Sequence, residues 1–110
     1  MPYEVVLVEP AKVFLQKLHE KLQAKAYRAI DLLVYFGPQL WMPHSRKLGT
    51  FDLWELRVQQ GGMIGRLFYF HDREKVYVVT SGYVKKTEKT SPEEMQRALL
   101  LKAEYLRGRA

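Results

Sequence analysis

The residues best placed for chemistry are two arginines that we expect to face each other across a β-hairpin. A Gly-Gly pair at 61–62 separates two strand-like segments, 51–59 and 63–71, and a two-residue glycine turn predicts a tight hairpin. Counting back along both strands from that turn places Arg57 directly opposite Arg66 on one face of the sheet.

Two positive charges at facing positions repel each other, at a cost of roughly 0.2–1 kcal/mol. The fold gains nothing structural from such a pair unless an anion balances it. Glu55, two residues before Arg57 on the same face, could supply that negative charge, and so could the phosphate of a ligand. Both alternatives stay open, and a shift of one residue in the hairpin register would separate the arginines.

A second basic segment follows the last predicted strand. Residues 82–90, GYVKKTEKT, contain three lysines, two threonines and a tyrosine, a combination that suits contacts with an RNA backbone and stacking on a base. We expect RNA contacts from Tyr83, Thr87 and Lys89, and from Arg46 in a predicted loop at 39–50. An ordinary solvated loop is the alternative interpretation.

The overall composition agrees with a polyanionic partner. Lys and Arg total 18 against 12 Asp and Glu, a net charge of +6, and a basic surface speeds encounter with nucleic acid. The chain has no cysteine, and its three histidines (His19, His44 and His71) have no metal-ligand spacing, so we expect surface histidines, no metal and no cofactor. It has no signal-peptide pattern and no run of about 18 apolar residues, so we expect a cytoplasmic protein without membrane contact.

The segments around these residues predict a single α+β domain over residues 1–110. Seven elements are expected in the order βααβββα: a strand at 3–8, two helices (or one bent helix) from 11 to 36 with a joint at 19–23, strands at 51–59, 63–71 and 75–82, and a helix from Ser91-Pro92 to a stop at Gly108. This order predicts two N-terminal helices packed on a mostly antiparallel sheet, with the helices on one face and a helix at the C-terminus. The hairpin residues expected to face the helices are Trp54, Leu56, Val58, Leu67 and Tyr69.

Three segments together resemble a known family. They are LWELR at 53–57, GRLFYF at 65–70 and GYVKKT at 82–87, with Lys47-Leu48 before them and Ser91-Pro92 after them. This pattern resembles the phage-derived, HigB-like branch of the RelE toxin superfamily, the toxins of type II toxin–antitoxin systems.

The resemblance implies a RelE-like fold and a ribosome-dependent mRNA interferase. In that reaction the mRNA 2′-hydroxyl attacks the adjacent phosphorus without a metal, leaving a 2′,3′-cyclic phosphate and a 5′-hydroxyl. Arg66 would hold the scissile phosphate and Arg57 would support it. Lys47, Lys85 and Lys86 would neutralise charge on the phosphorane and move protons.

The implied partners are the ribosome, mRNA and a helix-turn-helix antitoxin in a hetero-oligomer. The chain departs from the family pattern at Gly65, where an aromatic residue is frequent, and at Tyr83, where phenylalanine is usual. It also lacks the C-terminal His-Tyr pair of some relatives, so the general base stays unassigned. Two alternatives remain, a ParE-type toxin that poisons DNA gyrase and a non-catalytic RNA-binding module, because fold alone does not separate them.

Overall fold

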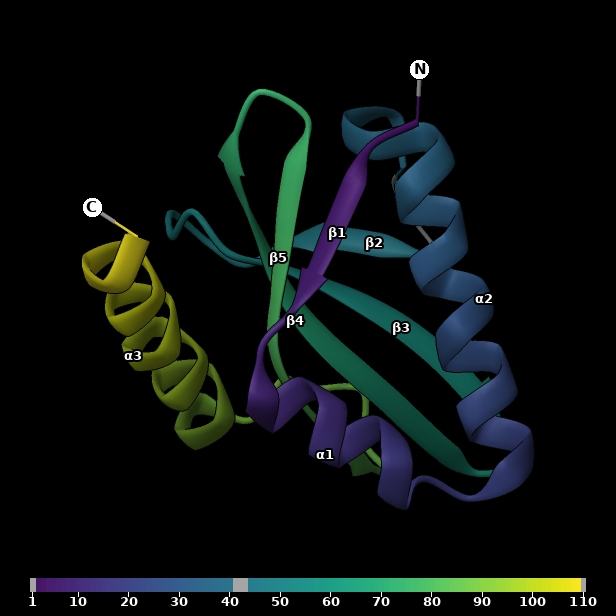
Figure 1. The fold of residues 1–110 in the computed structure, drawn as a ribbon. Helices are drawn as coiled ribbons and strands as arrows, with labels where there is room; N and C mark the ends of the chain where they lie inside the picture. The colour runs from purple at the N-terminus through teal and green to yellow at the C-terminus, as the bar shows by residue number, and fades with distance from the viewer. Residues whose placement is uncertain (1, 41–43, 110) are drawn as a thin grey trace.

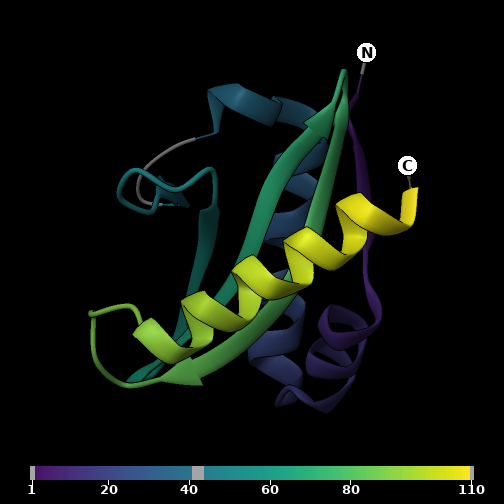
Figure 2. The same ribbon diagram turned by 90° about the vertical axis from the view of Figure 1, so that its left-hand side faces the viewer.

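The computed structural model describes residues 2–40 and 44–109, which form a five-stranded sheet covered by helices on both faces (Figures 1 and 2). The elements are β1 (Glu4–Leu7), α1 (Glu9–Lys17), α2 (Glu20–Phe36), a 3₁₀ turn (Gly37–Gln39), β2 (Ser45–Lys47), β3 (Trp54–Gln60), β4 (Met63–Arg73), β5 (Val76–Lys85) and α3 (Pro92–Arg109). The strand order is β1-β5-β4-β3-β2, with β1 parallel to β5 and every other pair antiparallel. The helices in the described part of the chain are too short or too polar to span a lipid bilayer.

The predicted α+β class and element order are confirmed, with one strand added. β2 lies within residues 39–50, so the prediction of a loop there is wrong for 45–47. Three residues are too few to produce a readable alternation, and β2 forms because it pairs with the edge of β3. Residues 41–43 of the predicted loop lie outside the described residues. The predicted stop at Gly108 is also slightly early, since α3 runs to Arg109.

The predicted hairpin register is confirmed. Gln60 pairs with Met63 across the two-residue turn, and Arg57 pairs with Arg66. Gly61 adopts φ of +61°, a conformation that glycine reaches without strain, which explains a glycine at this turn.

The predicted inner face of the hairpin packs under α1 and α2. Leu56, Leu67 and Tyr69 belong to a buried cluster with residues of both helices, and Trp54 and Val58 pack against it. The predicted joint between the helices is also confirmed, because α1 ends at Lys17 and His19 caps α2 by accepting a hydrogen bond from the Lys21 amide.

The expectation that the helices share one face is wrong for α3, which crosses the opposite face of β4 and β5 (Figure 2). That face carries apolar side chains that need cover: Leu53 and Phe68 are buried against Ala98 of α3. Phe70 contacts Tyr105 edge-on at 6.0 Å between ring centroids. The arginine pair therefore lies on a face that is covered along most of its length.

Stability should fall at high pH because of a buried tyrosine. Burial raises the pKa of Tyr77 to about 12, and the nearby Tyr69 and Tyr3 add to the effect. A tyrosine in the unfolded chain has a pKa of about 10. The contribution of neutral Tyr77 to the free energy of unfolding is therefore complete below about pH 10 and is lost as the pH rises towards 12. Tyr77→Phe should flatten this decline in urea denaturation between pH 9 and 11. Tyr35→Phe, at an exposed position, is the matched control, and equal pH profiles for Tyr77→Phe and wild type would contradict the prediction.

Candidate active site

Arg66 is a fully buried cation in the middle of the sheet. Its Nη1 donates to the Ile64 carbonyl at 3.2 Å and its Nη2 donates to the Thr87 carbonyl. Its Cζ lies 5.0 Å from the centroid of the Tyr83 ring. Nε is buried without a hydrogen-bond partner among the described residues. This guanidinium is therefore held by neutral groups, with no carboxylate bound to it among the described ion pairs.

Arg57, the facing arginine, is paired with a buried carboxylate. Its Nε donates to Glu55 Oε1 at 2.6 Å, and Glu55 is fully buried. The other oxygen of Glu55 accepts from the Thr90 hydroxyl at 3.0 Å, and Arg46 Nε lies 3.9 Å from Oε1. Glu55 therefore balances the charge of Arg57, as one of the two alternatives predicted. No carboxylate among the described residues is paired with Arg66.

A loop covers both arginines. This loop, residues 86–90 (the lysine loop), places the Thr87 carbonyl on Arg66 and the Glu88 carbonyl on Arg57. The Glu88 carboxylate also lies 3.6 Å from Arg57 Nη1. Two successive carbonyl oxygens thus occupy guanidinium N–H groups of the kind that bind phosphate oxygens.

The predicted closeness of the lysine segment to the arginine pair is confirmed by these bonds and by the strand register. Tyr83 is the partner of Arg66 on β5, and Lys85 is the partner of Ile64, two residues along. Lys85 is therefore on the same face as Arg66. Lys86 and Lys89 are exposed on the lysine loop.

Tyr83 and Lys47 lie in surroundings that the sequence did not indicate. The Tyr83 ring stacks on Phe68 at 5.8 Å between ring centroids, and its hydroxyl accepts from the Ser91 amide at 2.7 Å, so this tyrosine packs within the protein.

Lys47 is opposite Trp54 on the α1–α2 face, with Nζ 6.0 Å from the Trp54 ring centroid. Strand alternation therefore separates Lys47 from the arginine pair, which it was predicted to join.

A cavity of about 410 Å³ lies beside Arg57, between α2 and β3. Sequence reasoning missed three residues that line it: Lys25, Arg28 and His44. Lys25 and Arg28 are three positions apart on α2, a spacing that places side chains on one helix face. This spacing could have indicated from the sequence that the two cations lie together. His44 gave no signal, because its place beside Arg57 comes from the backbone pairing of the Arg57 amide with the His44 carbonyl at 2.9 Å.

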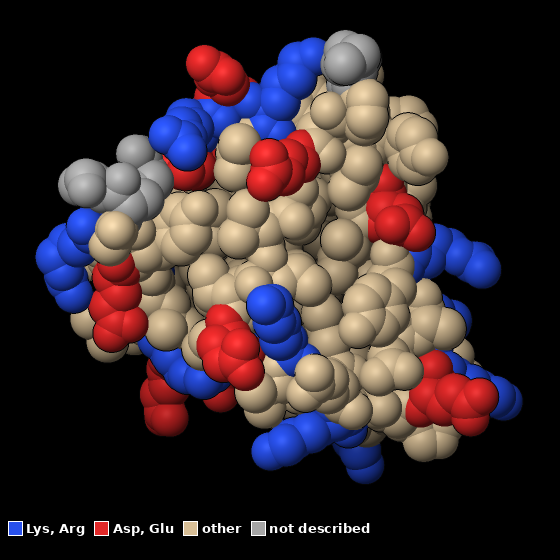
Figure 3. Space-filling model, viewed as in Figure 1, with Lys and Arg blue, Asp and Glu red and all other residues tan. Residues whose placement is uncertain are grey.

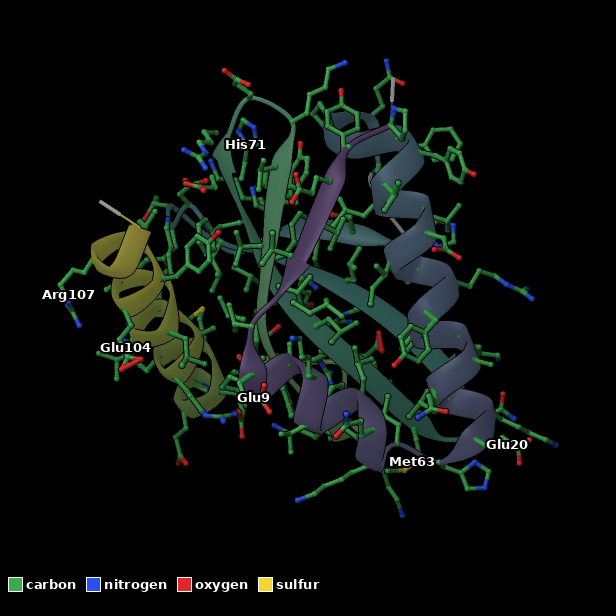
Figure 4. All side chains as sticks on the ribbon, viewed as in Figure 1. Glu9, Glu20, Met63, His71, Glu104 and Arg107 are labelled. Carbon is green, nitrogen blue, oxygen red and sulfur yellow. The ribbon has the colours of Figure 1, made fainter. Side chains whose placement is uncertain are left out.

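The other two histidines lie away from the arginine pair. His19 caps α2, and His71 lies at the opposite end of β4 from Met63 (Figure 4), where its ring is hydrogen-bonded to the Glu74 carbonyl. Within residues 2–40 and 44–109 no group of three His, Asp or Glu side chains is arranged to hold a metal ion. Of the three histidines, His44 is therefore the one that lies next to Arg57.

The charges do not form one continuous positive surface on the face seen in Figure 3. Acidic and basic side chains are scattered over that face, some of them near its centre, and uncharged residues separate them. The net charge of +6 is therefore not concentrated at one place on this face, and the arginine pair is the more specific indication of an anionic partner.

Comparisons with known proteins identify the fold. A family model described as phage-derived protein Gp49-like matches residues 13–102. The E. coli toxin RelE, solved in the free state as an arginine-to-alanine mutant, is similar with a TM-score of 0.66 and 21% identity, over 90% of this chain and 96% of that one. The archaeal RelE–RelB complex from Pyrococcus horikoshii OT3 is similar with a TM-score of 0.57 and 25% identity, over 82% of this chain and 100% of that one. The RelBE2 toxin–antitoxin complex of Mycobacterium tuberculosis is similar with a TM-score of 0.58 and 21% identity, over 77% of this chain and 100% of that one. No curated protein matches the chain.

Proposed function

The chain belongs to the Gp49-like family of phage-derived proteins, and from this we propose that it is the toxin of a type II toxin–antitoxin pair. Solved structures that share its fold are RelE toxins, two of them bound to antitoxins. In finer detail we propose a cytoplasmic mRNA interferase of the HigB-like branch that cuts mRNA on the ribosome. The observation that carries this proposal is the facing pair Arg57–Arg66, in which Glu55 and Glu88 both lie beside Arg57 and none of the described ion pairs involves Arg66.

In the proposed reaction the chain supplies charge where charge develops. The mRNA 2′-hydroxyl loses its proton and attacks the adjacent phosphorus, and the bond from phosphorus to the 5′-oxygen breaks. That oxygen takes up a proton, so the products are a 2′,3′-cyclic phosphate and a 5′-hydroxyl. Arg66, which pairs with no carboxylate in the described part of the chain, binds the phosphate oxygens and stabilises the phosphorane, and Arg57 supports it. Lys85 lies on the same face to neutralise charge, and Lys86 follows it in the loop.

Proton transfer needs a base, and the site offers two kinds. The adjacent amines of Lys85 and Lys86 are one, and His44, which lines the cavity together with Arg57, is the other, since histidine is the commonest general base in enzymes. Replacing His44 with glutamine should slow cleavage at saturating toxin about 100-fold or more if histidine is the base, whereas substitution of both lysines should do so if a lysine is.

The lysine loop must move before a phosphate can reach Arg66. The Thr87 carbonyl occupies Nη2, and Arg66 is fully buried. Because a phosphate offers charged oxygens in place of neutral carbonyls, it forms the stronger hydrogen bonds. RNA would therefore displace the Thr87 and Glu88 carbonyls and free Lys86, Thr87 and Lys89 to contact the backbone.

Removing the negative charge of Glu88 should favour the open loop. An exposed ion pair is worth about 0.2–1 kcal/mol, so Glu88→Gln should raise the rate of mRNA cleavage at subsaturating toxin by up to about fivefold. Glu93→Gln removes the same charge from the exposed side of α3 and should leave the rate unchanged. Equal rates for Glu88→Gln and wild type would show that the Glu88 carboxylate does not hold the loop closed.

Primer extension on mRNA from cells expressing the protein tests the function. Cuts within translated codons are expected, and they should disappear when translation is blocked before the ribosome assembles. Inhibited gyrase with intact mRNA would indicate the ParE-type alternative. RNA binding without cuts or growth arrest would indicate a non-catalytic module.

The partner we propose is a helix-turn-helix antitoxin, since a cell does not tolerate a free mRNA interferase. Co-expression with the neighbouring reading frame should yield one hetero-oligomeric species on gel filtration. Elution of the two proteins separately at micromolar concentration would contradict the pairing.

A further inference from the structure

We propose that the cavity between α2 and β3 binds one nucleotide of single-stranded RNA, next to the phosphate held by the arginine pair. This inference rests on the proposed function and adds a substrate subsite to it. The cavity, of about 410 Å³, falls within the range of about 300–1,000 Å³ that is usual for small-molecule sites.

The charge on the cavity wall favours a phosphate. Lys25, Arg28 and Arg57 line it, and Glu88 is the one acidic residue among its described lining residues. Lys25 and Arg28 are exposed and come from the same face of α2. Lys25 Nζ donates to the Gln59 carbonyl at 2.6 Å, which holds the ammonium group at the edge of β3. Two exposed cations beside an arginine that is already paired suit the backbone of RNA, because phosphate contacts from lysine and arginine supply most of the affinity for nucleic acid.

The remaining wall favours a base. Ala29 and Leu32 of α2 and Val58 of β3 form an apolar surface, and His44 completes the lining. Unstacked RNA bases are bound by apolar contact and by stacking on rings that include histidine. A cavity that combines this surface with three cations therefore has the two kinds of group that a single nucleotide requires.

Arg57 joins this cavity to the arginine pair. Its side chain lines the cavity and reaches the Glu88 carbonyl, while its neighbour across the sheet is Arg66. A phosphate that replaces Glu88 on Arg57 lies at the rim of the cavity. The nucleotide on one side of that phosphate can then enter the cavity without a further change in the sheet, so the two sites accept neighbouring units of one strand.

The test uses a probe that cannot be cut, a trinucleotide with 2′-O-methyl groups, titrated into the full chain and followed by amide chemical shifts. The largest shifts are expected at Leu32, Val58 and Gln59. Lys25→Gln with Arg28→Gln should weaken binding about tenfold or more, because both substitutions remove charged groups that can contact phosphate. The same pair of substitutions should flatten the salt dependence by about 0.7 units of slope per lost phosphate contact. Lys12→Gln with Lys17→Gln, on exposed positions of α1, removes equal charge and should change affinity less than twofold.

Cleavage on programmed ribosomes separates this subsite from the proposed function. A raised concentration requirement with an unchanged rate at saturation is expected for the Lys25→Gln/Arg28→Gln variant. Wild-type cleavage with identical affinity and salt slope in that variant would overturn the subsite and leave the function standing. Trinucleotide binding in the cavity by a wild-type protein that cuts no mRNA would support the subsite and contradict the function. Loss of antitoxin binding with unchanged RNA binding in the variant would assign the cavity to the protein partner and overturn the proposal.

Discussion

Replacing Arg66 with lysine is expected to slow mRNA cleavage about 100- to 1,000-fold at saturating toxin, because one preorganised charged contact to the transition state is typically worth that much. Lysine keeps the positive charge, but its single ammonium group cannot reproduce a planar fork that donates to the Ile64 carbonyl from Nη1 and offers Nη2, released from the Thr87 carbonyl, to a phosphate oxygen. Single-turnover cleavage on ribosomes programmed with a defined mRNA measures the effect directly.

Lysine is the informative substitution because alanine at a fully buried position would also leave a cavity. Arg97→Lys, on an exposed part of α3, is the matched control and should cleave at the wild-type rate. Thermal unfolding checks that Arg66→Lys remains folded. A folded Arg66→Lys variant with full activity would show that Arg66 is a structural residue and remove it from the mechanism.

Replacing Glu55 with alanine should cause the largest loss of stability in the site. Glu55 is fully buried and is bound to Arg57 and to the Thr90 hydroxyl. Removing one partner of a buried ion pair leaves an uncompensated charge, which typically costs about 3–5 kcal/mol. Because Arg57 keeps 13% of its side chain exposed, we expect a loss of about 3 kcal/mol in the free energy of unfolding, measured by urea denaturation.

Two further variants separate the ion pair from simple packing. Glu104→Ala, whose side chain points away from the protein on α3 (Figure 4), should change stability by less than about 0.5 kcal/mol. Glu55→Leu combined with Arg57→Met should recover most of the stability, since apolar residues of similar size often replace a buried pair without loss. A Glu55→Ala variant as stable as wild type would show that the carboxylate is not buried in solution.

Much of this fold could be predicted because its signals are local. The glycine turn fixed the hairpin register, and that register alone placed Arg57 opposite Arg66. Proline and serine at the start of α3 predicted its first turn, where the Ser91 hydroxyl accepts from the Glu94 amide at 3.3 Å.

The features that were missed depend on contacts between distant segments. β2 is three residues long and exists through its pairing with β3, and α3 covers the opposite face because Leu53 and Phe68 require burial there. The cover of the lysine loop over Arg66 depends on carbonyl groups, which every residue has. The types of the residues in the loop therefore could not predict that it covers Arg66. No sequence pattern could predict that His44 lies beside Arg57 either.

The most direct test of the proposed reaction is cleavage of an mRNA that carries one 2′-deoxynucleotide at the cut site, on purified ribosomes with the purified protein. Attack by the 2′-hydroxyl predicts that cutting is abolished at the substituted position and persists at unsubstituted codons, with 2′,3′-cyclic phosphate and 5′-hydroxyl ends. Unchanged cutting at the 2′-deoxy position, or intact mRNA at every toxin concentration, would contradict it.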